Sequence, residues 1–428
     1  MTLDTRPPSG PQPFDPWPQP ATTQAPPAFQ QPTAWGAEPN RVAPQERSGR
    51  RRVAELSLVA LLSAGLATGG TYAVARTTGP AAAPATASQS AALPQVNAPV
   101  VQANGSTPDW TATAKAVSPS VVAIAVSGPQ GEGEGSGVVI DTAGHVLTNN
   151  HVATGGGSGA TLRVTLDDGR TYAATIVGTD PSTDLAVLQL TNPPSDLRPI
   201  SFGDSKALAV GDPVMAVGNP LGLAGTVTTG IVSALDRPVS TGSSQQQPPR
   251  GGASSADTVV TNAIQTSAAI NPGNSGGALV DASGRLVGIN SAIASLGGST
   301  GSGQGGNIGI GFAIPSNTAK LITEQLIATG TAQHAYLGVS SADGTATTGT
   351  ATREAAVVRT VAAGSPAAQA GLQAGDAVVA LDGRRVDSSL GLVAAIREQR
   401  VGATVTLTVV RGGQTLDVKV ALAARPQA

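Results

Sequence analysis

Residue types that can support nucleophilic catalysis occur in separate motifs along the chain. Ser275 lies in the glycine-rich segment Asn271-Pro272-Gly273-Asn274-Ser275-Gly276-Gly277. A hydroxyl nucleophile needs donors directed at the oxygen that becomes negatively charged, and the backbone N–H groups of Gly273 and Ser275 are suited to supply two. The flanking glycines permit a tight turn and close approach of a substrate backbone. Taken alone the segment is a weak signal, because such sequences also occur in ordinary loops.

A serine nucleophile needs a base, and the chain contains only the histidines His145, His151 and His334. His145 precedes the start of an apolar strand, and His334 lies at a junction between domains. His151 stands at the end of a strand that is predicted to be buried, where its ring would be held in place. We therefore expect His151 to be the base, and we expect His334→Ala to leave catalysis intact.

The base in turn needs a carboxylate that orients it. Asp184 begins the apolar run 184–188 and is the best candidate. Asp180, Asp167 and Asp168 remain alternatives, although each is of a kind that is common in turns. The order His, Asp, Ser within one β-rich region makes a catalytic triad the leading hypothesis.

Short apolar runs broken by Gly, Asn and Asp begin near Asp109 and must position these residues. Strand-like runs are found at 121–126, 137–140, 161–166, 185–190, 214–217 and 286–289. Their spacing favours an all-β barrel or sandwich. Pro315 precedes a predicted helix over 316–329, which Gly330 ends. The Gly-, Ser- and Gln-rich stretches 240–256 and 296–306 are expected to be mobile surface loops.

The last ninety residues form a separate predicted unit of mixed α and β structure. Strands are expected at 356–361, 378–381, 404–410 and 415–422, and a helix at 390–398. The last two strands flank Gly412-Gly413, which is typical of a hairpin turn.

The N-terminal quarter of the chain has a different composition. Residues 1–52 are rich in proline and predict a disordered tail. Residues 53–76 include an uncharged stretch, 56–75, which is long enough for a transmembrane helix, and the arginines crowded before it place the tail in the cytoplasm. A cleaved signal sequence is the alternative, because Ala-Pro-Ala-Thr-Ala follows at 83–87. Residues 77–108 read as a flexible linker.

The composition excludes several classes of function. The chain has no cysteine, which rules out thiol nucleophiles, disulfides and cysteine-bound metals. A formal net charge of −2 does not suggest a nucleic-acid partner. With so few histidines a metal site is not expected, and no cofactor is predicted.

Together these motifs resemble the HtrA (Deg) family of serine proteases, over roughly residues 110–425. The matching stretches are 135–140, 145–152, 177–187, 217–222, 268–277, 288–290 and 306–317. The resemblance implies a mainly β fold, with a chymotrypsin-like double β-barrel at 109–330 followed by a small α+β PDZ domain at 335–424. It implies His151 as general base, Asp184 as its orienting carboxylate and Ser275 as nucleophile. It also implies an oxyanion hole of the amides of Gly273, Asn274 and Ser275.

The resemblance further implies a substrate pocket and a peptide-binding loop. An S1 pocket lined by Ile270, Ile293 and Ala294 would suit small or medium aliphatic residues. In the PDZ domain the loop Tyr336-Leu337-Gly338-Val339 would bind a peptide C-terminal carboxylate, with β-strand addition alongside.

The expected function is an ATP-independent serine endopeptidase that cleaves unfolded or misfolded extracytoplasmic proteins. By family analogy it would be a homotrimer, anchored by a single transmembrane helix with the protease and PDZ domains outside the cytoplasm. The alternative is a proteolytically silent PDZ adaptor or holdase that uses the barrel as a scaffold.

Two features depart from the family pattern. Ser267 stands where most relatives have Asp, and the 240–256 insertion falls where relatives carry a regulatory loop.

Overall fold

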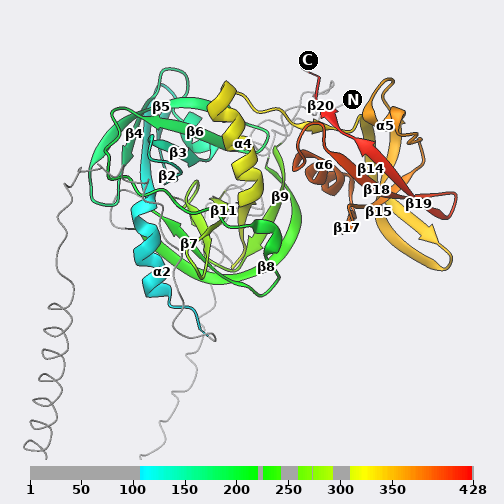
Figure 1. The fold of residues 1–428 in the computed structure, drawn as a ribbon, viewed down its shortest axis with the longest axis horizontal. Coiled ribbons are helices and arrows are strands. Elements are labelled where there is room, and N and C mark those ends of the chain that lie inside the picture. The colour runs from blue at the N-terminus through cyan, green and yellow to red at the C-terminus, as the bar shows by residue number, and fades with distance from the viewer. Residues whose placement is uncertain (1–106, 220–224, 242–258, 272, 293–308, 427–428) are drawn as a thin grey trace, which may run out of the picture. The chain divides into compact units, whose positions relative to one another are not determined.

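The computed structural model describes residues 107–219, 225–241, 259–271, 273–292 and 309–426 (Figure 1). The predicted tail at 1–52, the predicted transmembrane helix at 53–76 and almost all of the predicted linker lie outside these residues. So do most of the 240–256 insertion and the whole of 296–306. Within the described ranges, no helix has the length and apolar character that a membrane crossing requires.

Six strands close into a first barrel, in the order β1-β2-β3-β6-β5-β4. Neighbouring strands run antiparallel, and the barrel interior is filled by side chains such as Ile124, Val164 and Leu188. Helix α2 (Trp110–Val117), capped by the Asp109 carboxylate, and a 3-10 turn (Ser118–Ser120) precede it. The strands are β1 (Val121–Gly128), β2 (Gly131–Val139), β3 (His145–Thr148), β4 (Thr161–Thr165), β5 (Thr171–Asp180) and β6 (Leu185–Leu190).

Six further strands close into a second barrel, in the order β10-β11-β12-β9-β8-β7. A short 3-10 turn (Ser205–Ala207) comes just before it, and helix α4 (Ser316–Thr329) follows it. Gly330, which ends α4, has the left-handed conformation (φ 75°) that favours glycine at this position. The strands are β7 (Pro213–Gly218), β8 (Thr226–Thr241), β9 (Val259–Thr266), β10 (Ala278–Asp281), β11 (Leu286–Ser291) and β12 (Gly311–Pro315).

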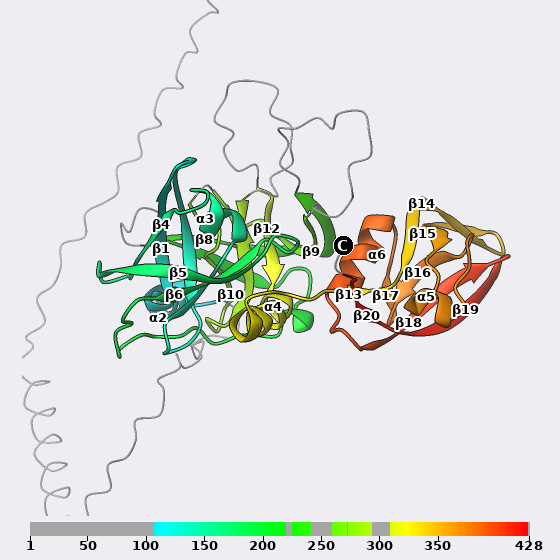
Figure 2. The same ribbon diagram turned by 90° about the horizontal axis from the view of Figure 1, so that it is seen from above.

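One hydrophobic cluster joins the two barrels and α4. Leu147 and Val187 of the first barrel, Met215 and Ile289 of the second, and Ile322 of α4 are all buried in it. Helix α4 contacts β5 and β6 on one side and β11 and β12 on the other (Figures 1 and 2). The barrels are therefore held against each other by a shared core.

A third unit follows α4 and has a core of its own, which includes Val378, Leu407 and Val409. Its main sheet has the order β14-β15-β16-β18-β19, so that β14 is an edge strand, and β13 pairs with β20. The elements are β13 (Ala335–Tyr336), β14 (Val339–Thr348), β15 (Ala351–Val361), α5 (Pro366–Gln369), β16 (Ala377–Leu381), β17 (Arg384–Arg385), α6 (Ser389–Arg397), β18 (Thr404–Arg411), β19 (Gln414–Ala421) and β20 (Ala423–Ala424).

The architecture confirms the predicted mainly β fold with two barrels and a small α+β unit. The helix at 316–329 is confirmed at both ends. The hairpin at Gly412-Gly413 is confirmed, and both glycines have the positive φ that such a turn requires (57° and 79°). Helix α2 and the long strand β8 were not predicted.

Candidate active site

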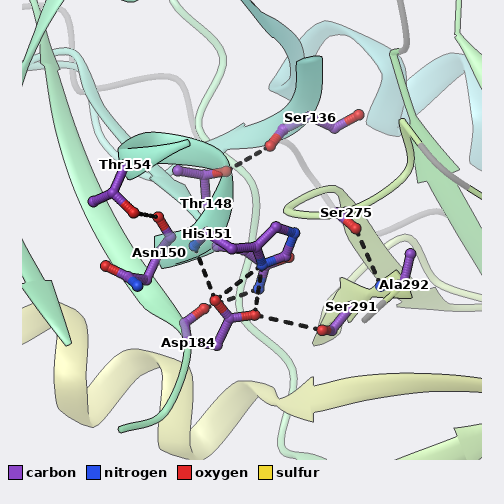
Figure 3. A network of polar contacts seen from close by, with 10 residues as sticks. Ser136, Thr148, Asn150, His151, Thr154, Asp184, Ser275, Ser291 and Ala292 are labelled. Carbon is purple, nitrogen blue, oxygen red and sulfur yellow. Dashed lines mark hydrogen bonds and ion pairs between the residues drawn. The ribbon is translucent and has the colours of Figure 1, made fainter. Parts of the chain in front are cut away.

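His151 is placed by the short helix α3 (Asn150–Thr154), which follows β3 directly. Its ring Nδ1 lies 3.0 Å from Oδ1 and 2.9 Å from Oδ2 of Asp184, and its backbone N–H donates to Oδ1 at 3.0 Å (Figure 3). An ionised carboxylate only accepts hydrogen bonds, so Nδ1 carries the proton. The other ring nitrogen, Nε2, is then the one that remains available to accept a proton.

Asp184 is fixed by its surroundings in a backbone conformation that is unusual for a residue other than glycine. Its φ is 59°, and its side chain is 7% exposed. The carbonyl accepts from Asn149 Nδ2 at 2.9 Å and from the N–H of Asn150 at 3.1 Å. Ser291 Oγ lies 3.5 Å from the carboxylate oxygen Oδ2. Such a conformation persists when the surrounding contacts over-determine it, and it is often found at functional sites.

Among the described residues, none of the alternative carboxylates pairs with His151. Asp167 and Asp168 are exposed in the turn between β4 and β5, and Asp168 pairs with Arg170. The hydrogen bonds of Arg170 hold the pKa of Asp168 below its ordinary value. Asp180 is buried at the end of β5, where its carboxylate pairs with His334.

Burial alone would raise the pKa of Asp180, but the interactions with its neighbours, those with His334 first among them, lower it. The hydroxyls of Thr183 and Ser182 act in the same direction, and the pKa stays below its ordinary value. Among the four candidates, the structure brings Asp184 to His151.

Ser275 lies in the turn between β9 and β10, on the second barrel. It is 5% exposed, and Gly273 and Gly276 beside it have φ of 95° and 82°. In Figure 3 the ring of His151 lies between the carboxylate of Asp184 and the loop of Ser275. Ser275 Oγ accepts a hydrogen bond from the N–H of Ala292 at 3.1 Å. No hydrogen bond joins His151 to Ser275 in the described part of the chain.

The predicted oxyanion-hole amides differ in their hydrogen bonding. The N–H of Asn274 donates to the carbonyl of Asn271 at 3.0 Å and is therefore occupied in this structure. The amides of Gly273 and Ser275 remain the candidate donors for an oxyanion. These assignments stay predictions.

Ser136 is a residue whose part in the site was not predicted. It is fully buried on β2; its hydroxyl donates to the carbonyl of Gly273 at 2.6 Å and accepts from the N–H of Asn219 at 2.9 Å. Its own N–H donates to the carbonyl of Ser275 at 2.8 Å. Its carbonyl would lie 2.2 Å from a Cβ placed on Gly276, which explains the glycine there. The only signal in the sequence was its place in Gly135-Ser136-Gly137, one of the matching stretches.

The predicted substrate pocket is described only in part. Ile270 is 4% exposed and packs in the core of the second barrel with Val214 and Val232. Ile293 and Ala294 lie outside the described residues. The assignment of the pocket therefore stays a prediction.

The predicted carboxylate-binding loop precedes the edge strand β14. The carbonyls of Leu337 and Gly338 accept from the N–H groups of Ala367 and Ala362, both at 2.9 Å. Gly338 has φ 86°, and a Cβ there would lie 2.2 Å from the Cβ of Ser365. The loop is therefore fixed beside a strand with an open edge, which is the arrangement that strand addition needs.

Comparisons with known proteins agree with this arrangement. Residues 135–289 match the family model of the trypsin-like peptidase domain, and residues 335–422 match that of the PDZ domain. The chain is 44% identical over 380 residues to the serine protease PepD of Mycobacterium tuberculosis, which covers 86% of this chain and 76% of PepD. It is 41% identical over 293 residues to the periplasmic serine endoprotease DegP of Salmonella typhimurium. That match covers 67% of this chain and 56% of DegP.

Solved structures of HtrA-type proteases are also similar to this chain. The HtrA-type protease AlgW, in a structure with a tripeptide, is 32% identical, with a TM-score of 0.52. The match covers 75% of this chain and 99% of that chain.

Proposed function

Because the chain belongs to the HtrA family of serine proteases, we propose that it hydrolyses peptide bonds through Ser275, His151 and Asp184. One observation carries this assignment. The carboxylate of Asp184 holds His151 by Nδ1, at 2.9 and 3.0 Å, and leaves Nε2 on the ring edge opposite the carboxylate, with the Ser275 loop beyond it (Figure 3). A buried carboxylate, an oriented imidazole and a serine hydroxyl are the three parts that acyl transfer needs.

The proposed reaction has two halves. Ser275 Oγ attacks the scissile carbonyl carbon while His151 Nε2 takes the hydroxyl proton. The carbonyl oxygen becomes an oxyanion, to which the amides of Gly273 and Ser275 donate. The C–N bond then breaks, His151 returns the proton to the leaving amine, and an acyl-enzyme remains. Water attacks the ester by the same route and frees Ser275.

The proposed substrates are unfolded or misfolded proteins, cleaved without ATP. Relatives are named periplasmic serine endoproteases, and the PDZ domain has an open strand edge beside a fixed loop, suited to peptide C-termini. An apolar S1 pocket that includes Ile270, Ile293 and Ala294 would favour aliphatic residues.

The proposed setting is the cell membrane, with a cytoplasmic N-terminus and the enzymatic part on the other side. The uncharged stretch at 56–75 and the arginines before it support this proposal. A homotrimer is proposed by family analogy. A mature N-terminus found near Ser88 would favour a cleaved signal sequence instead.

The test compares the full chain with Ser275→Ala on an unfolded protein substrate. We expect the variant to lose about 10⁴-fold or more in kcat. His151→Ala should lose a similar amount, whereas His145→Ala, at a histidine paired with Asp141, serves as the matched control. Equal cleavage by wild type and Ser275→Ala would overturn the protease assignment. If neither cleaves and both bind the substrate, the adaptor or holdase function is favoured.

A further inference from the structure

We infer that His334, in the segment between α4 and β13, is a positioning residue for the catalytic carboxylate. It fixes the turn that leads from Asp180 to Asp184. The inference rests on the proposed function, because it takes Asp184 as the carboxylate of the triad. It also reverses the expectation from the sequence that His334→Ala leaves catalysis intact.

The contacts of His334 converge on one ring nitrogen. Nε2 lies 2.9 Å from Oδ2 of Asp180 and 2.8 Å from Oγ of Ser182. The side chains of His334 and Asp180 are 12% and 6% exposed, so the pair is largely shielded from water. Hydrogen bonds to an ionised carboxylate are strong, and shielding from water strengthens them further.

The protons of this cluster can be assigned. The hydroxyl of Ser182 donates to Asp180 Oδ1 at 2.7 Å, so its oxygen is free to accept from His334. His334 Nε2 therefore carries a proton. Nδ1 of the same ring is buried and has no partner among the described residues. The ring thus acts through Nε2 alone, and a side chain with one donor at that place can replace it.

The turn that His334 holds leads directly to the triad. Asp180 also accepts from the N–H of Ser182 at 3.1 Å and from the hydroxyl of Thr183, the residue before Asp184. On its C-terminal side, the carbonyl of Asp184 accepts from Asn149 and Asn150, and its carboxylate accepts from the N–H of His151. On its N-terminal side, the Asp180 cluster is the corresponding anchor. Since Asp184 has φ 59°, loosening that anchor lets it relax and moves the carboxylate away from His151.

His334 is itself held from both sides. Its carbonyl accepts from the N–H of Arg425, next to β20, at 3.0 Å. Its ring binds the turn before β6, which is 152 residues away in sequence. Asp180 also interacts electrostatically with the positive charge of Arg397 on α6. These contacts keep the ring in place without any contribution from the triad.

The test uses three substitutions of His334 in the full chain. The amide nitrogen of Gln takes the place of Nε2, whereas that of Asn takes the place of Nδ1. We expect His334→Ala and His334→Asn to lower kcat by about ten- to hundredfold with KM unchanged. His334→Gln should recover most of the loss. Asp180→Asn should lower kcat similarly, and combining it with His334→Ala should add little.

Two further readouts separate positioning from folding. The rate at which Ser275 reacts with a fluorophosphonate reports the triad without peptide binding. The Nδ1 proton signal of His151 reports its bond to Asp184, and it is assignable because the chain has three histidines. Both should change in His334→Ala and not in the control His145→Ala.

The outcomes distinguish the two proposals. A wild-type chain that neither cleaves protein nor reacts with the fluorophosphonate would refute the proposed function. If the wild type is active and His334→Ala has the same kcat and the same His151 proton signal, the positioning role alone is refuted. Failure of His334→Gln to recover activity would also refute it, because the argument rests on a single donor at Nε2.

Discussion

Nδ1 of His151 lies within hydrogen-bond distance of both carboxylate oxygens of Asp184. Nε2 is therefore the ring nitrogen that is left to act as base. The sequence predicted the pairing of His151 with Asp184, which the structure contains, whereas the catalytic role of Ser275 stays a prediction. Ser136 was beyond such reasoning, because its hydroxyl acts on a carbonyl 137 residues away. His334 was missed for the same reason. A side chain that works by holding another segment has no local signature.

Ser136 provides a prediction at this scale. In Ser136→Ala the carbonyl of Gly273 and the N–H of Asn219 both lose a buried partner. An unsatisfied buried group costs about 1–3 kcal/mol, so we expect the rate at which Ser275 reacts with the fluorophosphonate to fall by about ten- to hundredfold. The rate of the fluorophosphonate reaction at Ser275 is the measurement. Ser127→Ala, at an exposed serine of β1, is the control. An unchanged rate would show that the Gly273 loop keeps its conformation without Ser136.

At the scale of elements, prediction succeeded where the pattern is local. The helix α4 has a proline before it and a glycine after it, and both of its ends were predicted. Strand β8 was missed because it is long, largely polar and irregular, with shifts in its pairing to β9 near Ala234. The conformation of β8 depends on its pairing with the other strands of the barrel, and those strands are distant in the sequence.

A substitution of Gly338 tests whether the conformation of the loop before β14 requires glycine. Gly338→Ala puts a Cβ 2.2 Å from that of Ser365, in addition to the cost of φ 86°. Gly364→Ala, with φ 72° and no atom within 4 Å of its Cβ, is the control, and it should cost only about 1–2 kcal/mol. We expect Gly338→Ala to lose more protection from hydrogen exchange in β14 and β15, and to lose peptide binding. Equal losses of protection and of peptide binding in the two variants would mean that Ser365 can move aside without a loss of stability.

Asp376 makes the PDZ domain sensitive to acid. Its carboxylate is 1% exposed and binds Arg411 at 2.6 and 2.7 Å. Burial raises its pKa, but the bonds from Arg411 and the N–H of Gln373 bring it below the ordinary value of 3.8. The unfolded chain therefore binds the proton more readily, and the stabilisation is lost as the pH falls from about 4 through the lowered pKa.

Hydrogen exchange of β16 and β18 in the full chain measures this loss. Protection factors should fall with acid in the wild type and vary less with pH in Asp376→Asn. The same pH dependence in both proteins would assign the acid sensitivity to other groups.

At the scale of the whole molecule, the active site depends on the contact between two barrels. His151 and Asp184 belong to the first barrel and Ser275 to the second. Ile322 of α4 is 1% exposed in the core that both share. The presence of two barrels followed by a PDZ domain was predictable from the family motifs. The shared core was not, because its residues come from segments spread over two hundred positions.

Ile322→Ala should therefore destabilise the protease as a unit. We expect its free energy of unfolding to fall by about 2–5 kcal/mol, with earlier loss of activity on heating. Ile327→Ala, on the same helix but 38% exposed, should cost much less. Urea unfolding followed by tryptophan fluorescence gives the comparison, since Trp110 packs against this core. Similar costs for the two variants would contradict the shared core.

The division of the site between the barrels also sets an order during synthesis. The strands of the first barrel are complete at Leu190, and by then the chain contains the base and its carboxylate. The serine is made later, and its loop is held only after the second barrel has formed. Since domains generally fold in the order in which they leave the ribosome, a growing chain that has not yet formed the second barrel lacks the serine loop of the site.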